Sequence, residues 1–512
     1  MAIQATERLP VGADPGNVAG VPRSRWSSFA WIGPTALFLI FSLATVGKAP
    51  LWSDEMATRE FSLLPIGALM QATSHVDRVL LPYYLIMHVW TVFGNGAVAL
   101  RLLSVVAGAV TVAVTARTAQ IAWGSIAAVV TGLALATNGQ FINYSIDARP
   151  YALVLLFTAI ATLSLVKVVS VSPTGRRWWA YSCAVSIAVL MQAFAILILL
   201  PHAIPFWRRE RRSLVYRWML AACLPVFLTL LLVVVSNSQR AQVSWIQRGS
   251  ASDAVHNFIA GTGESFHALL LILAIVFVLV LQLKRRFIDD EWAMSLGILI
   301  LPTAVLFVVS DLSAPVLVGR YVVSQLLGAA LLLGAGGQYL SGVVSSRTRV
   351  RAIVAAIVIV VMIGASFAGL RVTLRSPVTA GDDYPALARA LTAQVRAGDE
   401  LIIHQGYSSG GFADGVAYYL DDAAFLRAIT QELPNGEPPR YERVVAATTR
   451  FSTTTAQSAS HPPNVWVVQT TESPSSTTRG LVANGCVHID ANKDGEQFQQ
   501  FDGIFLMHFS CP

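Results

Sequence analysis

The sequence predicts a polytopic α-helical membrane protein that carries a small α/β domain outside the membrane at its C-terminal end. Three observations lead to this fold class. Of the 512 residues, 54% are hydrophobic and only 13% are charged, whereas soluble proteins carry about 25% charged residues. Apolar runs of roughly 17–25 residues, long enough to cross ~30 Å of hydrocarbon as helices, recur along the chain up to residue 370. Beyond that point the composition becomes that of a soluble domain.

The first 25 residues are rich in glycine, proline and polar side chains and contain no hydrophobic region. We therefore expect residues 1–25 to form a disordered cytoplasmic tail and not a cleaved signal peptide.

The basic residues indicate orientation. The net charge is +7, and the arginines and lysines gather in short clusters between apolar runs, as they do in cytoplasmic loops. This distribution argues against a nucleic-acid partner. The clusters are Arg23 and Arg25; Arg117; Arg176 and Arg177; Arg208, Arg209, Arg211, Arg212 and Arg217; Lys284, Arg285 and Arg286; and Arg347, Arg349 and Arg351.

These clusters predict about eleven transmembrane helices within a membrane domain of residues 26–371, with the N-terminus inside and the C-terminal domain outside. Residues 48–96 form a first external loop. The segment 178–207 is either a tight pair of spans turning near Gln192 or no crossing, and its apolar composition favours the pair. The predicted spans are 27–47, 97–116, 118–137, 151–170, the pair within 178–207, 214–236, 268–283, 291–310, 321–340 and 352–370.

Residues 376–512 are predicted to form the extracytoplasmic α/β domain. Strands are expected at 401-LIIH, 465-VWVVQ and 504-IFLMHF, and a helix from residue 384 to Gly398. Cys486 and Cys511 lie in this domain, where an oxidising exterior favours a disulfide over two free thiols.

Two adjacent carboxylates, Asp54 and Glu55, follow the first span in 51-LWSDEMATRE-60. Neighbouring carboxylates repel each other, and partial burial raises the pKa of at least one of them. Such a group can act as a general base on a hydroxyl. The alternative is a hydrated pair at a helix end, or a cap for the helix that follows.

The segment 73-TSHVDRVLLPYYLIMHVWTVFG-94 has an apolar part that is too short to cross a membrane and is rich in Tyr, Trp and His. This pattern predicts an interfacial helix on the outer surface. His75 and Asp77 precede the helix, and they either bind substrate or metal, or are a solvated helix start.

Two arginines, Arg149 and Arg320, are predicted on the outer side and break the positive-inside pattern. A guanidinium at that level can bind a phosphate with two hydrogen bonds. For Arg149 the alternatives are contact with lipid phosphate or a salt bridge to Asp147. Arg101 lies inside a predicted span, where it needs a carboxylate partner. Acids from one loop and arginines from others fit a membrane-bound substrate that carries phosphate, of which a lipid-phosphate-linked sugar is the leading candidate.

Four pieces of sequence, in this order, carry a resemblance to a known family. They are the acid pair 54-DE-55; the segment with Asp77, Pro82, Tyr83, Tyr84, His88, Trp90, Phe93, Gly94 and then Arg101; the box 147-DARPYAL-153; and 320-RY-321. The ordered set resembles the GT-C membrane glycosyltransferases, in particular the bacterial branch similar to protein O-mannosyltransferases and lipid A aminoarabinose transferases. One departure is Leu81-Pro82, where the family often has two prolines.

The resemblance implies inverting transfer of a sugar from a polyprenyl-phosphate donor on the outer face of the plasma membrane. Asp54 would be the base and Glu55 would support it. It also implies a set of substrate-binding residues, in which Arg149 and Arg320 would hold the phosphate. These residues are His75, Asp77, Tyr83, Arg101, Arg149, Tyr151, Arg320 and Tyr321.

The donor sugar and the acceptor stay open, with mannose as the default and a hydroxyl of an envelope protein, glycolipid or glycan as acceptor. We find no nucleotide-binding motif and no zinc spacing, and we expect neither cofactor nor metal, although some related enzymes use a divalent cation. The alternative functions are a transporter or flippase of a lipid-linked saccharide, which favours inverted repeats and acids at mid-membrane, and a non-catalytic envelope-assembly protein.

Overall fold

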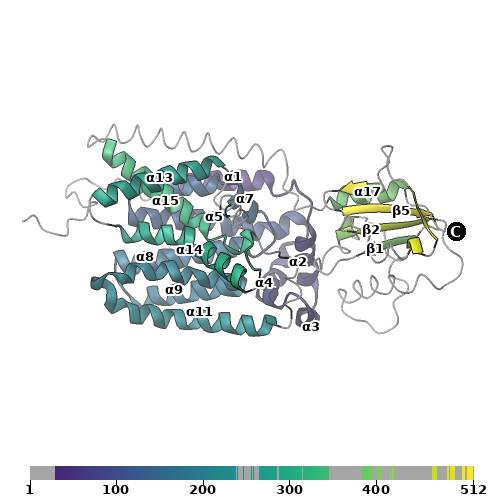
Figure 1. The fold of residues 1–512 in the computed structure, drawn as a ribbon, viewed down its shortest axis with the longest axis horizontal. Coiled ribbons are helices and arrows are strands. Elements are labelled where there is room, and N and C mark those ends of the chain that lie inside the picture. Colours follow the sequence, from purple (N-terminus) through teal and green to yellow (C-terminus); the bar gives the residue numbers. More distant parts are fainter. Residues whose placement is uncertain are drawn as a thin grey trace, which may run out of the picture.

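A computed structural model of the protein describes most of the helical part and several segments of the C-terminal domain. The described residues are 29–237, 239, 246, 255, 258, 265–284, 288–313, 315–344, 383–394, 400–404, 415–416, 418–419, 464–469, 481–483, 485–489, 499–501 and 504–510. Figure 1 shows a bundle of long, roughly parallel helices, three shorter helices stacked across one end of it, and the C-terminal domain beyond them. This arrangement confirms the predicted fold class.

The helices of the bundle coincide with the predicted spans. In chain order they are α1 (Ile32–Thr45), α5 (Ala97–Ala122), α6 (Ser125–Ala136) with α7 (Gly139–Ser145), α8 (Tyr151–Ser170), α9 (Gly175–Met191), α11 (Val215–Ser236), α13 (Ser265–Lys284), α14 (Asp290–Leu312) and α15 (Gln325–Val344). Within the described residues, five helices are long and apolar enough to cross a membrane, and six if the pair α6 and α7, bent by 67°, is one span. The predicted span 352–370 lies outside the described residues, and the count of eleven stays a prediction.

One predicted boundary is wrong. Arg117 was expected in a cytoplasmic loop, but it lies inside α5, which continues to Ala122. The chain turns instead at Gly124, whose φ of +116° is a left-handed conformation that glycine adopts without steric cost.

The predicted turn near Gln192 is present. Helix α9 ends at Met191, and the next residue, Gln192, has an extended backbone. The chain then returns through η4 (Ala193–Ile198), α10 (Leu199–Ala203) and η5 (Ile204–Trp207), which are followed by η6 (Arg209–Leu214). The returning arm is broken into short pieces because Pro201 and Pro205 lack the N–H that a continuous helix requires.

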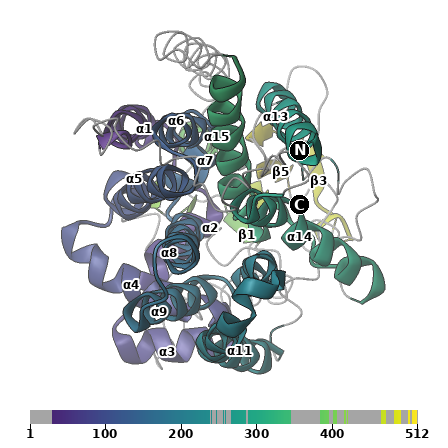
Figure 2. The ribbon, with the colours of Figure 1, turned by 90° about the vertical axis from the view of Figure 1, so that its left-hand side faces the viewer.

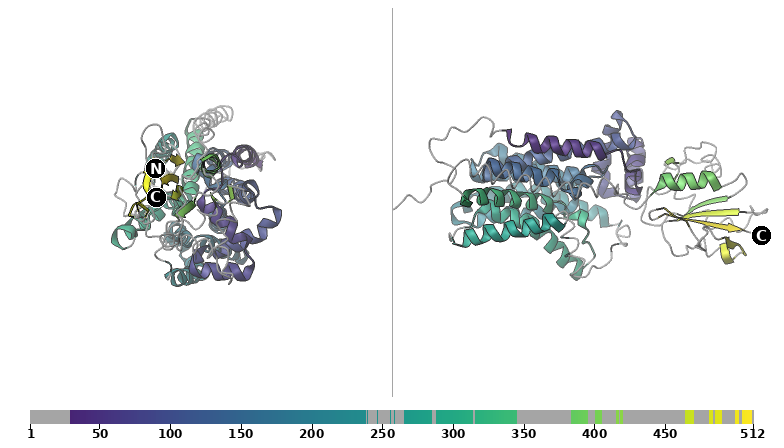
Figure 3. Two further views of the ribbon diagram at one scale, coloured as in Figure 1. Left: turned by 90° about the vertical axis from the view of Figure 1, so that its right-hand side faces the viewer. Right: turned by 90° about the horizontal axis from the view of Figure 1, so that it is seen from above.

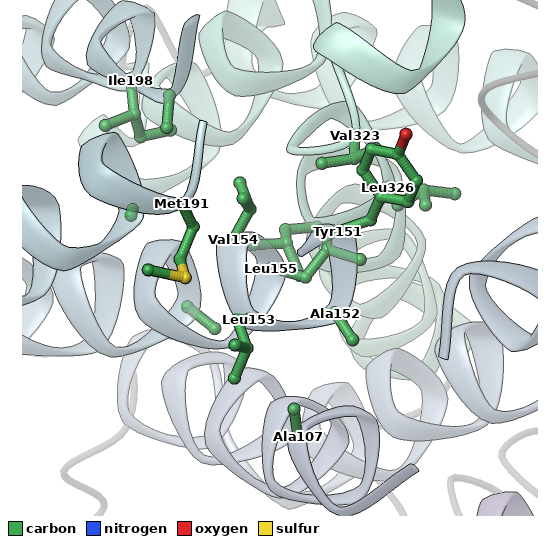
Figure 4. Packing of buried hydrophobic residues seen from close by; sticks show 14 of the residues in the cluster. Ala107, Tyr151, Ala152, Leu153, Val154, Leu155, Met191, Ile198, Val323 and Leu326 are labelled. Atoms are coloured by element: carbon green, nitrogen blue, oxygen red, sulfur yellow. The ribbon is translucent and has the colours of Figure 1, made fainter. Parts of the chain in front are cut away.

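Helix α8 lies between α5 and α9 in the bundle (Figure 2). Figure 4 shows Ala152–Leu155 of α8 among Ala107 of α5 and Met191 of α9, and all of these residues belong to one buried cluster. Elsewhere, small residues allow backbones to meet. A side chain at Gly334 of α15 would collide with Thr131 of α6, as is common for glycine at helix contacts in membranes.

The segment predicted as the first external loop forms the three short helices across the end of the bundle, α2 (Ser53–Leu63), α3 (Ile66–His75) and α4 (Leu81–Trp90), with the 3-10 turns η2 (Arg78–Leu80) and η3 (Thr91–Phe93). Large apolar side chains on α3 and α4 are exposed, among them Met70 and Val89. The predicted interfacial position of this segment fits that exposure.

The C-terminal domain is a small sheet with one helix. The strands are β1 (Glu400–His404), β2 (Asn464–Gln469), β3 (Val487–Ile489), β4 (Gln499–Phe501) and β5 (Ile504–Ser510), in the order β1-β2-β5-β3 with β4 also paired to β5. Only β1 and β2 are parallel among these pairs.

Alternate residues of β2 pack on opposite faces of the sheet, as strand geometry requires. Trp466 and Val468 contact α17 (Tyr384–Gln394), which covers one face (Figure 3). On the other face, Val465 and Val467 pack with Cys486. The expected strands and helix are therefore present. Cys486 is disulfide-bonded, and Cys511 lies outside the described residues.

Candidate active site

The two adjacent acids at the start of α2 have different surroundings. Successive side chains of a helix point about 100° apart. Glu55 turns into the bundle and is fully buried, whereas the side chain of Asp54 is 25% exposed. Asp54 lies inside the helix and not at its cap, because α2 begins at Ser53.

Glu55 is the carboxylate partner that buried Arg101 was expected to need. The guanidinium of Arg101 holds both carboxylate oxygens, with Nε donating to Oε1 over 2.7 Å and Nη2 donating to Oε2. The two side chains are 5% and 1% exposed. Hydrogen bonds between ionised groups in this two-pronged geometry are among the strongest in proteins.

Both members of this ion pair also bind backbone groups of other segments. Arg101 also donates to the carbonyl oxygens of Val46, Ala49 and Pro50 over 2.8–2.9 Å. Glu55 in turn accepts the backbone N–H of Ala148 over 2.8 Å. The loop that leads into α2, the helix α5 and the loop before α8 are thereby tied together at one buried point.

Asp54 lies between two arginines that come from distant parts of the chain. Its Oδ2 is 3.5 Å from Nη2 of Arg149 and 3.3 Å from Nη1 of Arg320. Arg149 also donates to the backbone carbonyl of Asp54 over 3.3 Å. One carboxylate faces two guanidiniums, so this group carries a net positive charge that suits an anionic ligand.

Arg149 retains unused hydrogen-bonding capacity. The residue is only 8% exposed, and its Nε is buried with no hydrogen-bond partner among the described residues. Among the described residues, Arg149 forms its salt bridge with Asp54 and not with Asp147, the alternative partner considered above. Asp147 Oδ1 accepts the indole N–H of Trp52 over 3.1 Å. Burial, reinforced by the nearby Glu55 carboxylate, raises the pKa of Asp147 well above its usual range.

Arg320 is positioned by the break in the helical arm at residue 192. It lies in η8 (Gly319–Tyr321), just before α15. Its backbone carbonyl accepts a hydrogen bond from Gln192 over 2.9 Å. The neighbouring ring of Tyr321 packs against Phe194, with centroids 4.9 Å apart. The start of η4 therefore sets the direction from which Arg320 reaches Asp54.

The segment before α4 brings a further acid to the same end of the bundle. Asp77 has a φ of +54°, which aspartate tolerates better than most residues, and it accepts a hydrogen bond from Tyr84 over 2.9 Å. Burial raises the pKa of Asp77, although Arg149 partly opposes this shift. Tyr83 is 1% exposed and its hydroxyl has no partner among the described residues. The side chain of His75 lies outside the described part of the structure.

Tyr151, the first residue of α8, is buried, and its ring lies 5.2 Å from that of Tyr144. Figure 4 shows its ring on the side of α8 that faces Val323 and Leu326, next to η8. Of the predicted site residues, the acid pair, the three arginines and Asp77 thus gather at one end of the bundle. Within the described residues there is no group of three or more His, Cys, Asp or Glu side chains that could hold a metal ion.

Comparisons with known proteins bear on the fold of the chain. The family model described as dolichyl-phosphate-mannose-protein mannosyltransferase matches residues 77–236. Two crystal structures of ArnT from Cupriavidus metallidurans, one in the apo state and one bound to undecaprenyl phosphate, share the fold at 15% sequence identity, with TM-scores of 0.54 and 0.55. Each comparison covers 94% of this chain and 98% of the other chain. A search of curated protein sequences found no match.

The chain has the fold of these ArnT structures, and the family model matches part of it. The segment that matches the family model includes Asp77, Arg101 and Arg149, whereas Asp54 and Arg320 lie outside it. The last two join the first three through the fold, because α2 and η8 reach the same end of the bundle.

Several contacts around the candidate site were not anticipated from the sequence. Gln192 and Trp52 hold Arg320 and Asp147, respectively, and nothing in the local pattern indicated these pairs. From the C-terminal domain, Tyr419 accepts a hydrogen bond from the backbone N–H of Leu51. The only signal in the sequence was that Gln192 is an isolated polar residue within an apolar segment.

Proposed function

We propose that the chain transfers a sugar, with inversion, from a polyprenyl-phosphate donor to a hydroxyl of a cell-envelope acceptor on the outer face of the plasma membrane. Mannose is the first donor sugar to test, because the family that matches residues 77–236 is named for mannosyl transfer. The acceptor is a protein, a glycolipid or an envelope glycan.

The position of Asp54 between Arg149 and Arg320 carries this proposal. A phosphate group offers several strong acceptor oxygens, and two guanidiniums can hold them in fixed geometry. The unpartnered Nε of Arg149 supplies a buried donor for one of them. The ArnT structure bound to undecaprenyl phosphate has the same fold, which supports a polyprenyl phosphate as the leaving group here.

In the proposed step, Asp54 accepts the proton of the acceptor hydroxyl while that oxygen attacks the anomeric carbon of the donor sugar. The bond between that carbon and the phosphate oxygen breaks, and polyprenyl phosphate departs with the electron pair. Arg149 and Arg320 stabilise the negative charge that develops on the phosphate. Because the attack and the departure occur on opposite faces of the carbon, the product has inverted configuration.

Glu55 supports this step indirectly. Its carboxylate is occupied by Arg101 and by the N–H of Ala148, and the side chain is almost fully buried. We therefore assign Glu55 and Arg101 to holding the loop before α2, and Asp54 to the proton transfer. Asp77, Tyr83, Tyr151 and Tyr321 would line the substrate site, and His75 is proposed with them from the sequence alone.

The test compares Asp54→Asn with Glu60→Gln, which removes a carboxylate from the same helix. Glu60 is ion-paired to Arg59. Purified protein in nanodiscs is given radiolabelled polyprenyl-phosphate mannose and a membrane extract as acceptor. General base catalysis contributes about 10²–10⁴-fold, so Asp54→Asn should lose transfer by that factor while Glu60→Gln keeps it.

A second pair of variants tests the phosphate site. Arg149→Lys keeps the charge but loses the planar, two-pronged geometry, and Arg78→Lys makes the same change at an exposed position of η2. We expect a raised KM for the donor in Arg149→Lys alone. Equal transfer by wild type and Asp54→Asn would remove Asp54 from the reaction. A wild type that is inactive with every lipid-linked sugar offered would favour the transporter or assembly function.

A further inference from the structure

The C-terminal domain touches the loop that carries the acid pair. The backbone N–H of Leu51 donates to the hydroxyl oxygen of Tyr419 over 2.8 Å. Eight residues further along, the guanidinium of Arg59 lies 4.6 Å from the centre of the Tyr418 ring, a distance typical of a cation–π contact. Two neighbouring tyrosines of the C-terminal domain thus contact the loop just before α2 and the middle of α2.

The hydrogen bond from Leu51 is part of a larger set that fixes this loop. The carbonyls of Val46, Ala49 and Pro50 are held by Arg101, and the N–H of Trp52 points to Glu55 over 3.4 Å. All of those partners belong to the membrane domain. Among the residues that the structure describes, the N–H of Leu51 is the group of this loop that is hydrogen-bonded to the C-terminal domain.

Leu51 is fully buried, so its N–H has no ready substitute for Tyr419. A buried donor that loses its partner costs about 1–3 kcal/mol. The loop can recover that free energy only by shifting the N–H toward water. Asp54 lies three residues further on, within the first turn of α2, so such a shift moves its carboxylate.

Tyr419 is itself held in place by the C-terminal domain. Its ring lies parallel to that of Tyr384, at 7° with centroids 6.0 Å apart, and nearly perpendicular to that of Tyr418 at 4.9 Å. Tyr384 is fully buried in the core between α17 and the sheet, together with Trp466. The position of the Tyr419 hydroxyl therefore follows the position of the domain core.

We infer that Tyr419 is a positioning residue for Asp54, through which the C-terminal domain sets the rate of sugar transfer. This inference rests on the proposed function. It gives the C-terminal domain a direct part in the reaction: the hydroxyl of Tyr419 holds Leu51, Leu51 fixes the start of α2, and α2 directs Asp54 between Arg149 and Arg320. Misplacing a catalytic group by about 1 Å can cost about 100-fold in rate.

The test is Tyr419→Phe, which keeps the ring and its packing but removes the hydroxyl. Tyr418→Phe is the matched control, because it makes the same change at the adjacent residue and keeps a ring under Arg59. We expect kcat to fall by about 10- to 100-fold in Tyr419→Phe. KM for the donor should stay within twofold of wild type, because Arg149 and Arg320 are untouched. Tyr418→Phe should keep both constants.

Hydrogen–deuterium exchange tests the contact without relying on activity. A peptide covering residues 47–56 should take up about one additional deuteron at early times in Tyr419→Phe, from the Leu51 amide, and none in Tyr418→Phe. Unchanged exchange in Tyr419→Phe overturns the inference, whatever the transfer assay gives. Faster exchange with a wild-type kcat overturns it as well, as does an equal loss of kcat in both variants. If wild type transfers no sugar at all, the proposed function fails, and the exchange result then bears on the contact alone.

Discussion

Replacing Arg101 with methionine should strongly destabilise the membrane domain. The change leaves the carboxylate of Glu55 buried without its partner and removes the donor from three backbone carbonyls. Removing one member of a buried ion pair typically costs about 3–5 kcal/mol. Because Glu55 is only 1% exposed, it cannot recover its hydration without movement of α2. We therefore expect a loss at the upper end of that range.

The matched control is Arg117→Met, the same substitution in the same helix α5. Arg117 is exposed, and Gln120 is the hydrogen-bond partner recorded for its side chain. Exposed polar contacts of this kind contribute about 0–1 kcal/mol. The melting temperature of each variant, measured in one detergent at one protein concentration, should fall for Arg101→Met and stay near that of wild type for Arg117→Met.

A double variant separates the charge from the packing. Glu55→Gln added to Arg101→Met removes the unpaired buried charge, so the double variant should melt at or above the temperature of Arg101→Met. If the two substitutions lowered stability additively, Glu55 and Arg101 would not interact directly, since the effects of substitutions at interacting residues do not add. Equal melting temperatures for Arg101→Met and Arg117→Met would refute the reasoning entirely.

Two further predictions concern helix packing and pH. Gly334→Ala should lower the melting temperature, at a cost of about 1–3 kcal/mol, because its methyl group meets Thr131; Gly342→Ala in the same helix meets nothing within 4 Å and should not. Burial, then the neighbouring Glu291, raises the pKa of Asp289 from 3.8 to about 7. The folded state therefore keeps a proton that the unfolded state releases, and stability should fall as pH rises from about 4 to about 7. Asp289→Asn should flatten this part of the melting-temperature profile; an unchanged profile would contradict it.

The helices could be predicted well because burial in a membrane demands long apolar segments, and the residues 151–170 expected as a span are those of α8. The error at Arg117 has a physical cause. A charge suggests a loop, but a long arginine side chain can reach solvent from the last turns of a helix. The true end of α5 was marked by Trp123 and Gly124, where glycine permits the reversal.

The site could be predicted only in part, because its members meet through tertiary contacts. The sequence indicated that Arg101 needed an acid and that Arg149 and Arg320 needed an anion. It did not indicate that Glu55 satisfies the first and Asp54 faces the other two. Partners separated by hundreds of residues, such as Leu51 and Tyr419, have no local signature, since one tyrosine hydroxyl resembles any other in the sequence.

The adjacency of the two acids has a structural reason. A buried ion pair is costly to desolvate, and an apolar pair of similar size often gives equal or greater stability. The pair of Glu55 and Arg101 is better understood as an anchor, because it also holds three backbone carbonyls and one N–H from other segments. Because Asp54 directly precedes Glu55 in the same helix, the anchor also fixes the backbone of Asp54, while the two side chains point about 100° apart. Asp54 can therefore remain partly exposed, facing two arginines, without depending on its own contacts to stay in place.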